Sequence, residues 1–270
     1  MGIRAKNRKI YTVLILVCVV GFWLFENFYT PSTYSTTEAQ VISNGFPQEL
    51  YPSSSTGEIV HHSYFSLSYK EPFEQAEWVA YELKEEHLTY DDRKRPYFIE
   101  DPWVKSKSAD WRNYKGSGYD RGHLCPAGDR RFSEMAYNET FYTSNISPQD
   151  REFNAGIWNR LEMKVRSWAK NYNHLYVITG GILEDGLEEI GQEDVDVPKY
   201  FYKVIAKKRT NEWDVLGFII PNKEQSRPLQ NFTVPIDQIE KRTGIDFFEK
   251  MDEREQAEIE GEVYSRNWEF

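Results

Sequence analysis

The stretch YDRGHLCPAGDRR (residues 119–131) is followed closely by FYTSNISPQ (141–149) and FNAGIWNRLE (153–162). Together these segments place a histidine, asparagines, a glutamate and a group of arginines within one short part of the chain. Such a spacing fits a single supersecondary unit of extended segments followed by a helix. These residue types can assemble a metal-assisted hydrolytic site, so the rest of the chain is best considered around them.

The first segment supplies a histidine with an arginine two positions before it. Residues two apart on an extended segment share a face, so we expect Arg121 and His123 to project together. A neighbouring guanidinium keeps an imidazole neutral, and therefore able to accept a proton near pH 7. Hydrolysis of a phosphodiester needs a base for the attacking water and positive charge for the developing anion. His123 suits the first role and Arg121 the second, although a hydrogen-bonded structural histidine is the alternative.

The third segment begins an amphipathic run at residues 154–170, which predicts a helix with Asn154 at its N-terminal end. An ordinary helix cap is the alternative role for Asn154. Glu162 follows eight residues later and falls about 80° round a regular helix, so both side chains can face one cavity. An amide oxygen beside a carboxylate suits Mg²⁺, whereas zinc is disfavoured because no His/Cys cluster has ligand spacing.

The remaining chain predicts antiparallel strands and short helices. Alternating or apolar runs indicate strands, an acidic loop separates two of them, and a proline followed by an apolar pair indicates a helix before the acidic tail. Strands of this kind followed by isolated helices give an α+β class. The expected strands are 62–69, 76–83, 175–179, 200–206 and 213–220; the loop is 183–196 and the helix 233–243.

Charge is distributed unevenly along the chain. The formal net charge is -10, which argues against a protein that binds polyanions over its whole surface. Residues 103–170 nevertheless contain 12 Lys and Arg against 8 Asp and Glu, so the basic balance lies around the histidine segment. Arg93 and Arg95 lie in a basic loop that either forms a solvated surface or grips phosphate.

The N-terminus predicts membrane targeting. Four Lys and Arg residues in the first nine positions precede an uncharged apolar run at residues 10–25, and no small-residue cleavage site follows it. We therefore expect residues 1–28 to be an uncleaved anchor, with the rest of the chain in the periplasm or outside the cell. A Ser-, Thr- and Pro-rich linker is expected at 29–57, a catalytic domain at 58–250 and an acidic tail at 251–270. A buried N-terminal helix is the alternative.

The two cysteines do not predict a disulfide. Cys18 lies in the apolar run, far from Cys125, which follows the histidine. No acid or base pairs with Cys125 in the sequence, so a packed small side chain is favoured over a nucleophile.

Taken together, DRGH, SNISPQ and the asparagine helix resemble the DNA/RNA non-specific endonucleases of the ββα-metal, or His-Me finger, superfamily. That family includes the Serratia-type nuclease and mitochondrial endonuclease G. The similarity extends over about residues 64–248, through WVAY (78–81), YKGSGYD (114–120) and VPIDQIEKRTG (234–244). It implies a ββα-metal fold with a central antiparallel sheet flanked by helices.

The resemblance also implies roles for individual residues. His123 would be the general base, Asn154 the direct protein ligand of Mg²⁺, with Mn²⁺ as a substitute, and Glu162 would hold metal-bound waters. Arg121 would stabilise the transition state, and Asn145 would orient or support the site. Arg93 and Arg95 compete for the place of a further substrate-binding arginine.

The expected function is therefore Mg²⁺-dependent cleavage of DNA and RNA without strong sequence specificity. Two alternatives remain open at this point: a metal-dependent phosphodiesterase or nucleotidase for small substrates, and a nucleic-acid-binding protein without catalysis. The acidic balance of the rest of the chain fits small substrates better, whereas the joint presence of His123, Asn154 and Glu162 argues against loss of catalysis. The sequence leaves the oligomeric state open, with a homodimer among the alternatives.

Overall fold

A computed structural model describes residues 3–31, 33–34, 45–54, 57–209, 212–263 and 265–270. Part of the expected linker, residues 32, 35–44, 55 and 56, lies outside the described residues. The chain divides into two compact units, residues 1–33 and 34–270, which are considered separately.

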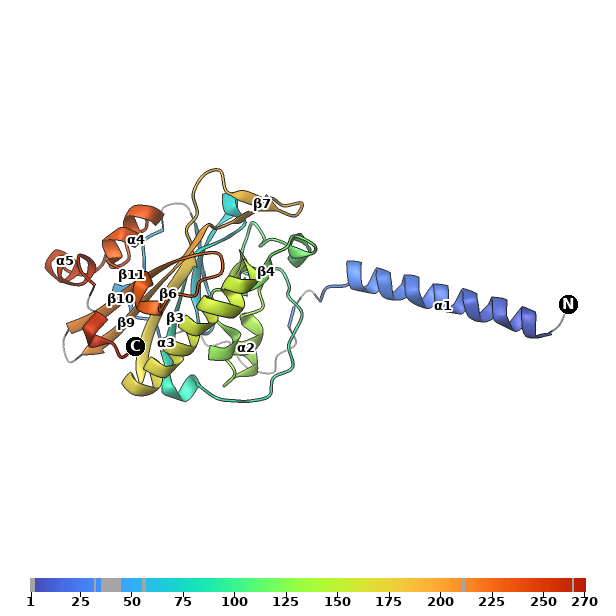
Figure 1. Ribbon diagram of the computed structural model, residues 1–270, viewed down its shortest axis with the longest axis horizontal. Coiled ribbons are helices and arrows are strands. Elements are labelled where there is room, and N and C mark those ends of the chain that lie inside the picture. Colours follow the sequence, from blue (N-terminus) through green and yellow to red (C-terminus); the bar gives the residue numbers. More distant parts are fainter. Residues whose placement is uncertain (1–2, 32, 35–44, 55–56, 210–211, 264) are drawn as a thin grey trace. The chain divides into compact units, whose positions relative to one another are not determined.

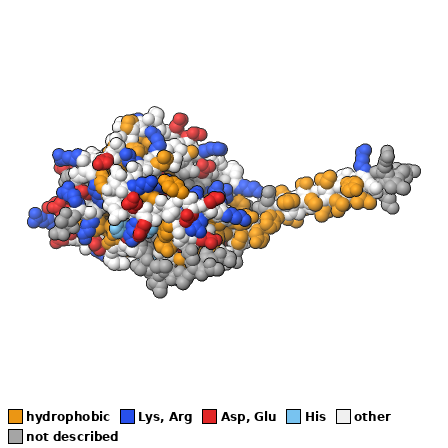
Figure 2. Space-filling view, turned by 90° about the horizontal axis from the view of Figure 1, so that it is seen from below, with side chains coloured by type: hydrophobic (Ala, Val, Ile, Leu, Met, Phe, Trp, Pro, Cys, Tyr) orange, Lys and Arg blue, Asp and Glu red, His pale blue; other side chains and the backbone are white. Residues whose placement is uncertain are grey.

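The first unit is a single helix, α1 (Ile3–Phe28). Residues Asn7–Phe25 form a stretch of 19 residues that is long and apolar enough to cross a membrane, and none of it is buried within the protein. Apolar side chains cover the face of this helix seen in Figure 2. At 1.5 Å per residue, 19 residues span about 29 Å, close to the thickness of a bilayer's hydrocarbon core. A signal sequence has the same length and composition, so the helix fits either an anchor or a signal.

The second unit is built on a seven-stranded sheet in which all neighbouring strands pair antiparallel. The strand order is β1-β2-β3-β6-β9-β10-β11. This confirms the expected α+β class and the hairpins predicted from the alternating segments. The strands are β1 (Glu58–His61), β2 (Ser66–Lys70), β3 (Gln75–Lys84), β6 (His174–Gly181), β9 (Tyr200–Arg209), β10 (Glu212–Pro221) and β11 (Thr233–Val234).

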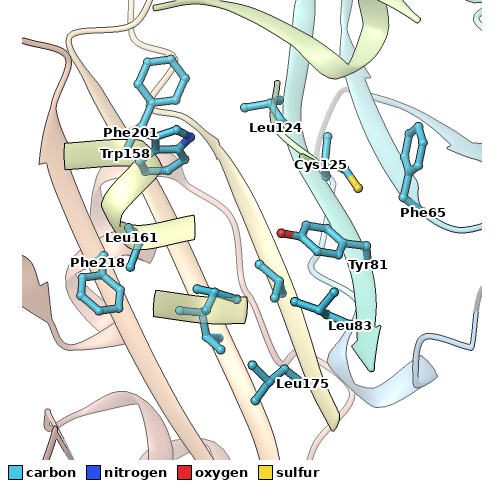
Figure 3. Packing of buried hydrophobic residues seen from close by; sticks show 14 of the residues in the cluster. Phe65, Tyr81, Leu83, Leu124, Cys125, Trp158, Leu161, Leu175, Phe201 and Phe218 are labelled. Atoms are coloured by element: carbon cyan, nitrogen blue, oxygen red, sulfur yellow. The ribbon is translucent and has the colours of Figure 1, made fainter. Parts of the chain in front are cut away.

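Both faces of this sheet are buried, because successive side chains of a strand point to opposite faces. In β3, Tyr81 and Leu83 join one hydrophobic cluster while Trp78 and Ala80 join another. The first cluster also contains the buried face of helix α3 (Asn159–Tyr172), whose Leu161 lies near Phe218 (Figure 3). The strands are therefore apolar on both sides.

Helices cover the two faces of the sheet (Figure 1). Helix α3 lies on one face, and α4 (Ile236–Thr243) and α5 (Glu253–Glu260) contribute buried residues to the cluster on the other. Pro235 precedes α4, whose first turn carries Asp237, and Gly244 ends it in the left-handed conformation with φ 72°. These start and stop signals confirm the short helix expected here.

A separate ββα unit stands beside the main sheet. Strand β4 (Asp120–His123) pairs antiparallel with β5 (Ile146–Gln149), and the chain then enters the helical segment that becomes α3. The connection between the two strands contains α2 (Glu134–Glu139). The histidine segment, SNISPQ and the asparagine helix thus form the supersecondary unit expected from their spacing.

Three segments differ from the expectation: part of the linker, the acidic loop and the C-terminal tail. Residues expected in the linker pack into the domain, since Phe46, Leu50 and Tyr51 are buried beside Trp78. The expected acidic loop at 183–196 contains a small hairpin of β7 (Glu188–Ile190) and β8 (Val195–Val197). Neither feature could be predicted from the sequence, because the apolar residues of both segments are sparse and follow no regular period.

The acidic C-terminal segment is also part of the domain. It begins with α5 on one face of the sheet and ends with Trp268 buried on the other, 5.0 Å from the ring of Trp168 in α3. The backbone carbonyl of Glu269 accepts hydrogen bonds from Trp168 Nε1 at 2.6 Å and Lys164 Nζ at 3.0 Å. Residues 251–270 therefore hold α3 in place, where the sequence suggested only a tail.

Replacement of Trp268 tests this attachment. Trp268→Ala removes a side chain that is 4% exposed, so it should lower the free energy of unfolding by about 3–5 kcal/mol. Trp103→Ala is the control, because Trp103 is 48% exposed and its loss should cost about 0.5 kcal/mol or less. Denaturant unfolding of the full-length protein in mild detergent measures both. Equal stability of the two variants would mean that the segment does not hold the domain together.

Candidate active site

The β4–β5 hairpin presents the histidine segment. The two strands pair Asp120 with Gln149 and His123 with Ile146. Gly122 lies between Arg121 and His123, and a Cβ at this position would fall 2.1 Å from Cδ of Gln149. Glycine is required because the Gln149 side chain packs directly on the strand, and this contact explains the glycine of DRGH.

An aromatic platform made of Phe98 and Phe141 holds three cationic or basic side chains together. The His123 ring lies 4.9 Å from Phe141 and 5.7 Å from Phe98. The Arg121 guanidinium lies 4.6 Å from the Phe98 ring, and that of Arg95 lies 5.3 Å from it. Cation–π attraction keeps both arginines beside the histidine despite their mutual repulsion.

This environment keeps His123 unprotonated. Burial, followed by the charges of Arg95 and Arg121, lowers the pKa of His123 to about 3. Its Nε2 is buried and has no hydrogen-bond partner among the described residues. A neutral imidazole with an unused nitrogen can accept a proton from water over a wide pH range.

Arg93 does not join this cluster. Its Nε donates to the carbonyl of Arg131 at 2.9 Å, and its Nη2 lies 3.3 Å from both the Phe132 carbonyl and an oxygen of Asp91. These contacts fix the basic loop. Of the two competing arginines, Arg95 is the one that approaches His123.

Asn145 fixes the chain just after β4. Its side-chain oxygen accepts from the backbone N–H of Cys125 at 2.8 Å, while its Nδ2 donates to the carbonyls of Cys125 at 3.0 Å and Thr140 at 2.9 Å. Asn145 is fully buried, so it fixes the chain two residues after His123 without reaching solvent. Cys125 is also buried, and burial raises its thiol pKa to about 12, as expected for a packed residue.

The helix after β5 begins with a cap that the sequence did not predict. Asp150 Oδ1 accepts from the backbone N–H groups of Glu152 and Phe153, both at 3.0 Å. Asp150 thus takes the capping role that was the alternative for Asn154. Asn154 lies one turn further on, where its Nδ2 donates to Asp120 Oδ2 at 3.0 Å.

A π turn at Phe153–Trp158, kinked at Gly156 with φ −98° and ψ −105°, precedes the regular helix. A π turn holds one residue more than an α turn. Because the backbone at Gly156 is not helical, the 80° expected between Asn154 and Glu162 on a regular helix does not apply here.

Glu162 lies in a buried network of charges. Its Oε2 is 3.4 Å from Arg166 Nη2, and Arg166 also bonds Asp129 at 2.5 Å. Burial raises the pKa of Glu162 to about 7, although Arg166 and Lys203 act in the opposite direction. The ammonium of Lys203 is fully buried 4.6 Å from the Trp158 ring and has no hydrogen-bond partner among the described residues.

The donor groups fit a hard divalent cation. Asn154 is half-buried, and its bond to Asp120 uses the amide nitrogen, so the amide oxygen is the atom that a cation would take. Asp120, which is bonded to Asn154, adds a carboxylate, and oxygen donors of this kind suit Mg²⁺ or Mn²⁺. Asp120 was not predicted as a donor from the sequence. Its position depends on the pairing of β4 with β5, which is evident only in the structure.

Comparison with known proteins shows the family of the chain. The family model for DNA/RNA non-specific endonucleases matches residues 42–254. The chain is 36% identical to mouse mitochondrial nuclease EXOG over 237 residues, which are 81% of this chain and 62% of that protein. It is 36% identical to human mitochondrial endonuclease G, covering 68% of this chain and 67% of that protein.

A fungal relative and a solved structure are also similar to this chain. Nuclease C1 of Cunninghamella echinulata var. echinulata is 37% identical, with 70% of this chain and 81% of that protein covered. A chain of the EndoG/EndoGI complex superposes with a TM-score of 0.70 and 31% identity, covering 85% of this chain and 99% of that chain. The chain therefore belongs to the DNA/RNA non-specific endonuclease family.

Proposed function

We propose that this protein is a Mg²⁺-dependent endonuclease that cleaves DNA and RNA without strong sequence specificity. The observation that carries the proposal is the unpartnered, neutral imidazole of His123 between two arginines. A nearby set of oxygen donors, from Asn154, Asp120 and Glu162, complements it. The relatives named as nucleases support the same activity, although the chain spans less than two thirds of the EXOG relatives' length.

In this proposal, the His123 imidazole accepts a proton from a water molecule as the water oxygen attacks phosphorus. Arg121 and Arg95 face the non-bridging oxygens, where negative charge grows as one bridging P–O bond breaks. The amide oxygen of Asn154 would hold the cation, and Glu162 would accept hydrogen bonds from waters around it. When bound, Mg²⁺ supplies further positive charge beside the phosphate.

A groove beside Glu162 favours a polymeric substrate over small phosphodiesters. It has a volume of about 620 Å³ and adjoins the site through Arg166, which bonds Glu162. Arg131 and Lys170 also line it, together with Tyr90, whose side chain is 87% exposed. Cationic and aromatic side chains in one groove suit a nucleic-acid strand, because they pair with phosphates and stack on bases.

We also propose that α1 anchors the protein in a membrane, with the nuclease domain in the periplasm or outside the cell. The four basic residues at its start favour a cytoplasmic N-terminus. Alkaline extraction of membranes tests the anchor. An anchored protein should stay with the membranes, whereas a soluble fragment beginning near residue 30 would mark a cleaved signal.

Degradation of plasmid DNA and RNA by the full-length protein tests the activity directly. Cleavage should require Mg²⁺ and stop with EDTA. His123→Ala should lower kcat by about 10²- to 10⁴-fold while the melting temperature stays near that of the wild type, because only the base is lost. Near-wild-type turnover in the folded variant would contradict the assignment of the base. Preference for mononucleotide esters over polymers would instead support the alternative small-substrate enzyme.

Arg95 and Arg93 form a matched pair for testing the aromatic platform. Arg95→Ala removes a positive charge beside His123, so the pKa of His123 should rise from about 3 toward its ordinary value. The acid limb of the pH profile of kcat/KM should therefore move to higher pH, and the rate at neutral pH should fall. Arg93→Ala should leave the acid limb unchanged. An identical effect of both substitutions would mean that Arg95 acts only through general surface charge.

Asn154 and Asp150 separate metal binding from helix capping. Asn154→Ala should weaken the Mg²⁺ dependence of activity severely with a small change in melting temperature. Asp150→Ala should lower stability by about 0.5–2 kcal/mol and leave the Mg²⁺ midpoint unchanged, because it removes the cap. Mg²⁺ titrations of activity with parallel thermal melts compare them. An unchanged Mg²⁺ midpoint for Asn154→Ala would remove it from the metal site.

A further inference from the structure

Three carboxylates gather where helices α4 and α5 meet, away from the β4–β5 hairpin. Asp237 and Glu240 lie one turn apart on α4, and Glu260 is the last residue of α5. One oxygen from each lies within 4.8 Å of the other two. Like charges this close destabilise a fold unless something neutralises them.

No side chain neutralises this cluster among the described residues. Glu260 is only 9% exposed, and its Oε1 is buried without a hydrogen-bond partner. Glu240 accepts one hydrogen bond, from the backbone N–H of Phe247 at 2.9 Å. A buried carboxylate oxygen that has no donor, on a side chain that lies among other carboxylates, points to a missing cation.

We propose that Asp237, Glu240 and Glu260 bind a Ca²⁺ ion that joins α5 to α4. Calcium takes six to eight oxygen ligands at about 2.4 Å, so two oxygens on opposite sides of the ion lie about 4.8 Å apart. The spacing of the three oxygens fits within that limit. Asp237 is exposed, so waters can complete the coordination from the solvent side.

Calcium suits the site better than magnesium does. Magnesium holds its waters tightly and commonly takes one or two carboxylates, whereas calcium accepts several carboxylates in a flexible arrangement. The donors here are all carboxylates, two from one helix turn and one from a second helix. The active site, by contrast, offers an amide oxygen.

The ion would stabilise the segment that ends against the catalytic helix. Residues 251–270 begin at α5 and end with Trp268 packed on Trp168 and Glu269 bonded to Lys164. With α5 fixed to α4, less chain entropy is lost when the rest of the segment packs on α3. The site would thus be structural, with an effect on stability rather than on the chemical step.

Thermal melts of the full-length protein in mild detergent test the proposal. After EDTA treatment and dialysis, CaCl₂ at about a hundredfold excess over its dissociation constant should raise the melting temperature by about 5–10 °C. NaCl at matched ionic strength should not. Absence of a calcium-specific shift in the wild type would overturn the site.

Four variants locate the effect. Glu260→Gln should abolish the calcium shift and melt no lower than the wild type in EDTA, because it relieves repulsion. Asp237→Asn, at an exposed position, should reduce the shift without a risk to folding. Glu255→Gln removes a charge from the same helix outside the cluster and should retain the full shift. Asn154→Ala should also retain it.

Two results would overturn the assignment. A full calcium shift in both Glu260→Gln and Asp237→Asn would exclude the cluster. Loss of the shift in Asn154→Ala would place the calcium effect at the active site. Failure of the nuclease assays would leave this test untouched, because it measures stability.

Discussion

Burial of one face of α3 is the constraint on which the active site depends. Trp158, just before α3, and Leu161 and Trp168 within it are fully buried. The ring of Trp158 lies beside Phe201 and Leu161 lies near Phe218 (Figure 3), while the ring of Trp168 lies 6.5 Å from that of Phe218. Rotation of the helix would expose two indoles, at a cost of several kcal/mol. Hydrophobic packing therefore sets the direction of the polar flank that carries Glu162.

The histidine half of the site is held by different forces. Asn145 ties down the backbone after His123, and the platform of Phe98 and Phe141 collects the arginines around the imidazole. A hydrogen bond from Asn154 to Asp120 joins this half to the start of the helix, and the Asp129–Arg166 ion pair joins it further along. Burial moves the pKa of His123 down and that of Glu162 up, so it favours a neutral base at one position and a readily neutralised acid at the other.

Periodicity and motif spacing predicted the antiparallel strands, the helix after Asn154 and the convergence of Arg121 with His123. They could not choose between Arg93 and Arg95, because that choice depends on aromatic rings brought from distant positions. Asp150 and Asn154 are both good capping residues, so only the backbone bonds identify the cap. The burial of Phe46 and Trp268 could not be predicted, because a single apolar residue in a polar segment gives no periodic pattern.

The π turn at Phe153–Trp158 has a consequence for variation in chain length. Its kink at Gly156, with φ −98° and ψ −105°, separates Asn154 from the regular helix that carries Glu162. A change of chain length at this point shifts Asn154 relative to Glu162, whereas the buried face of α3 keeps its packing on the sheet. The proposed chemistry therefore restricts the length of this segment more tightly than the fold does.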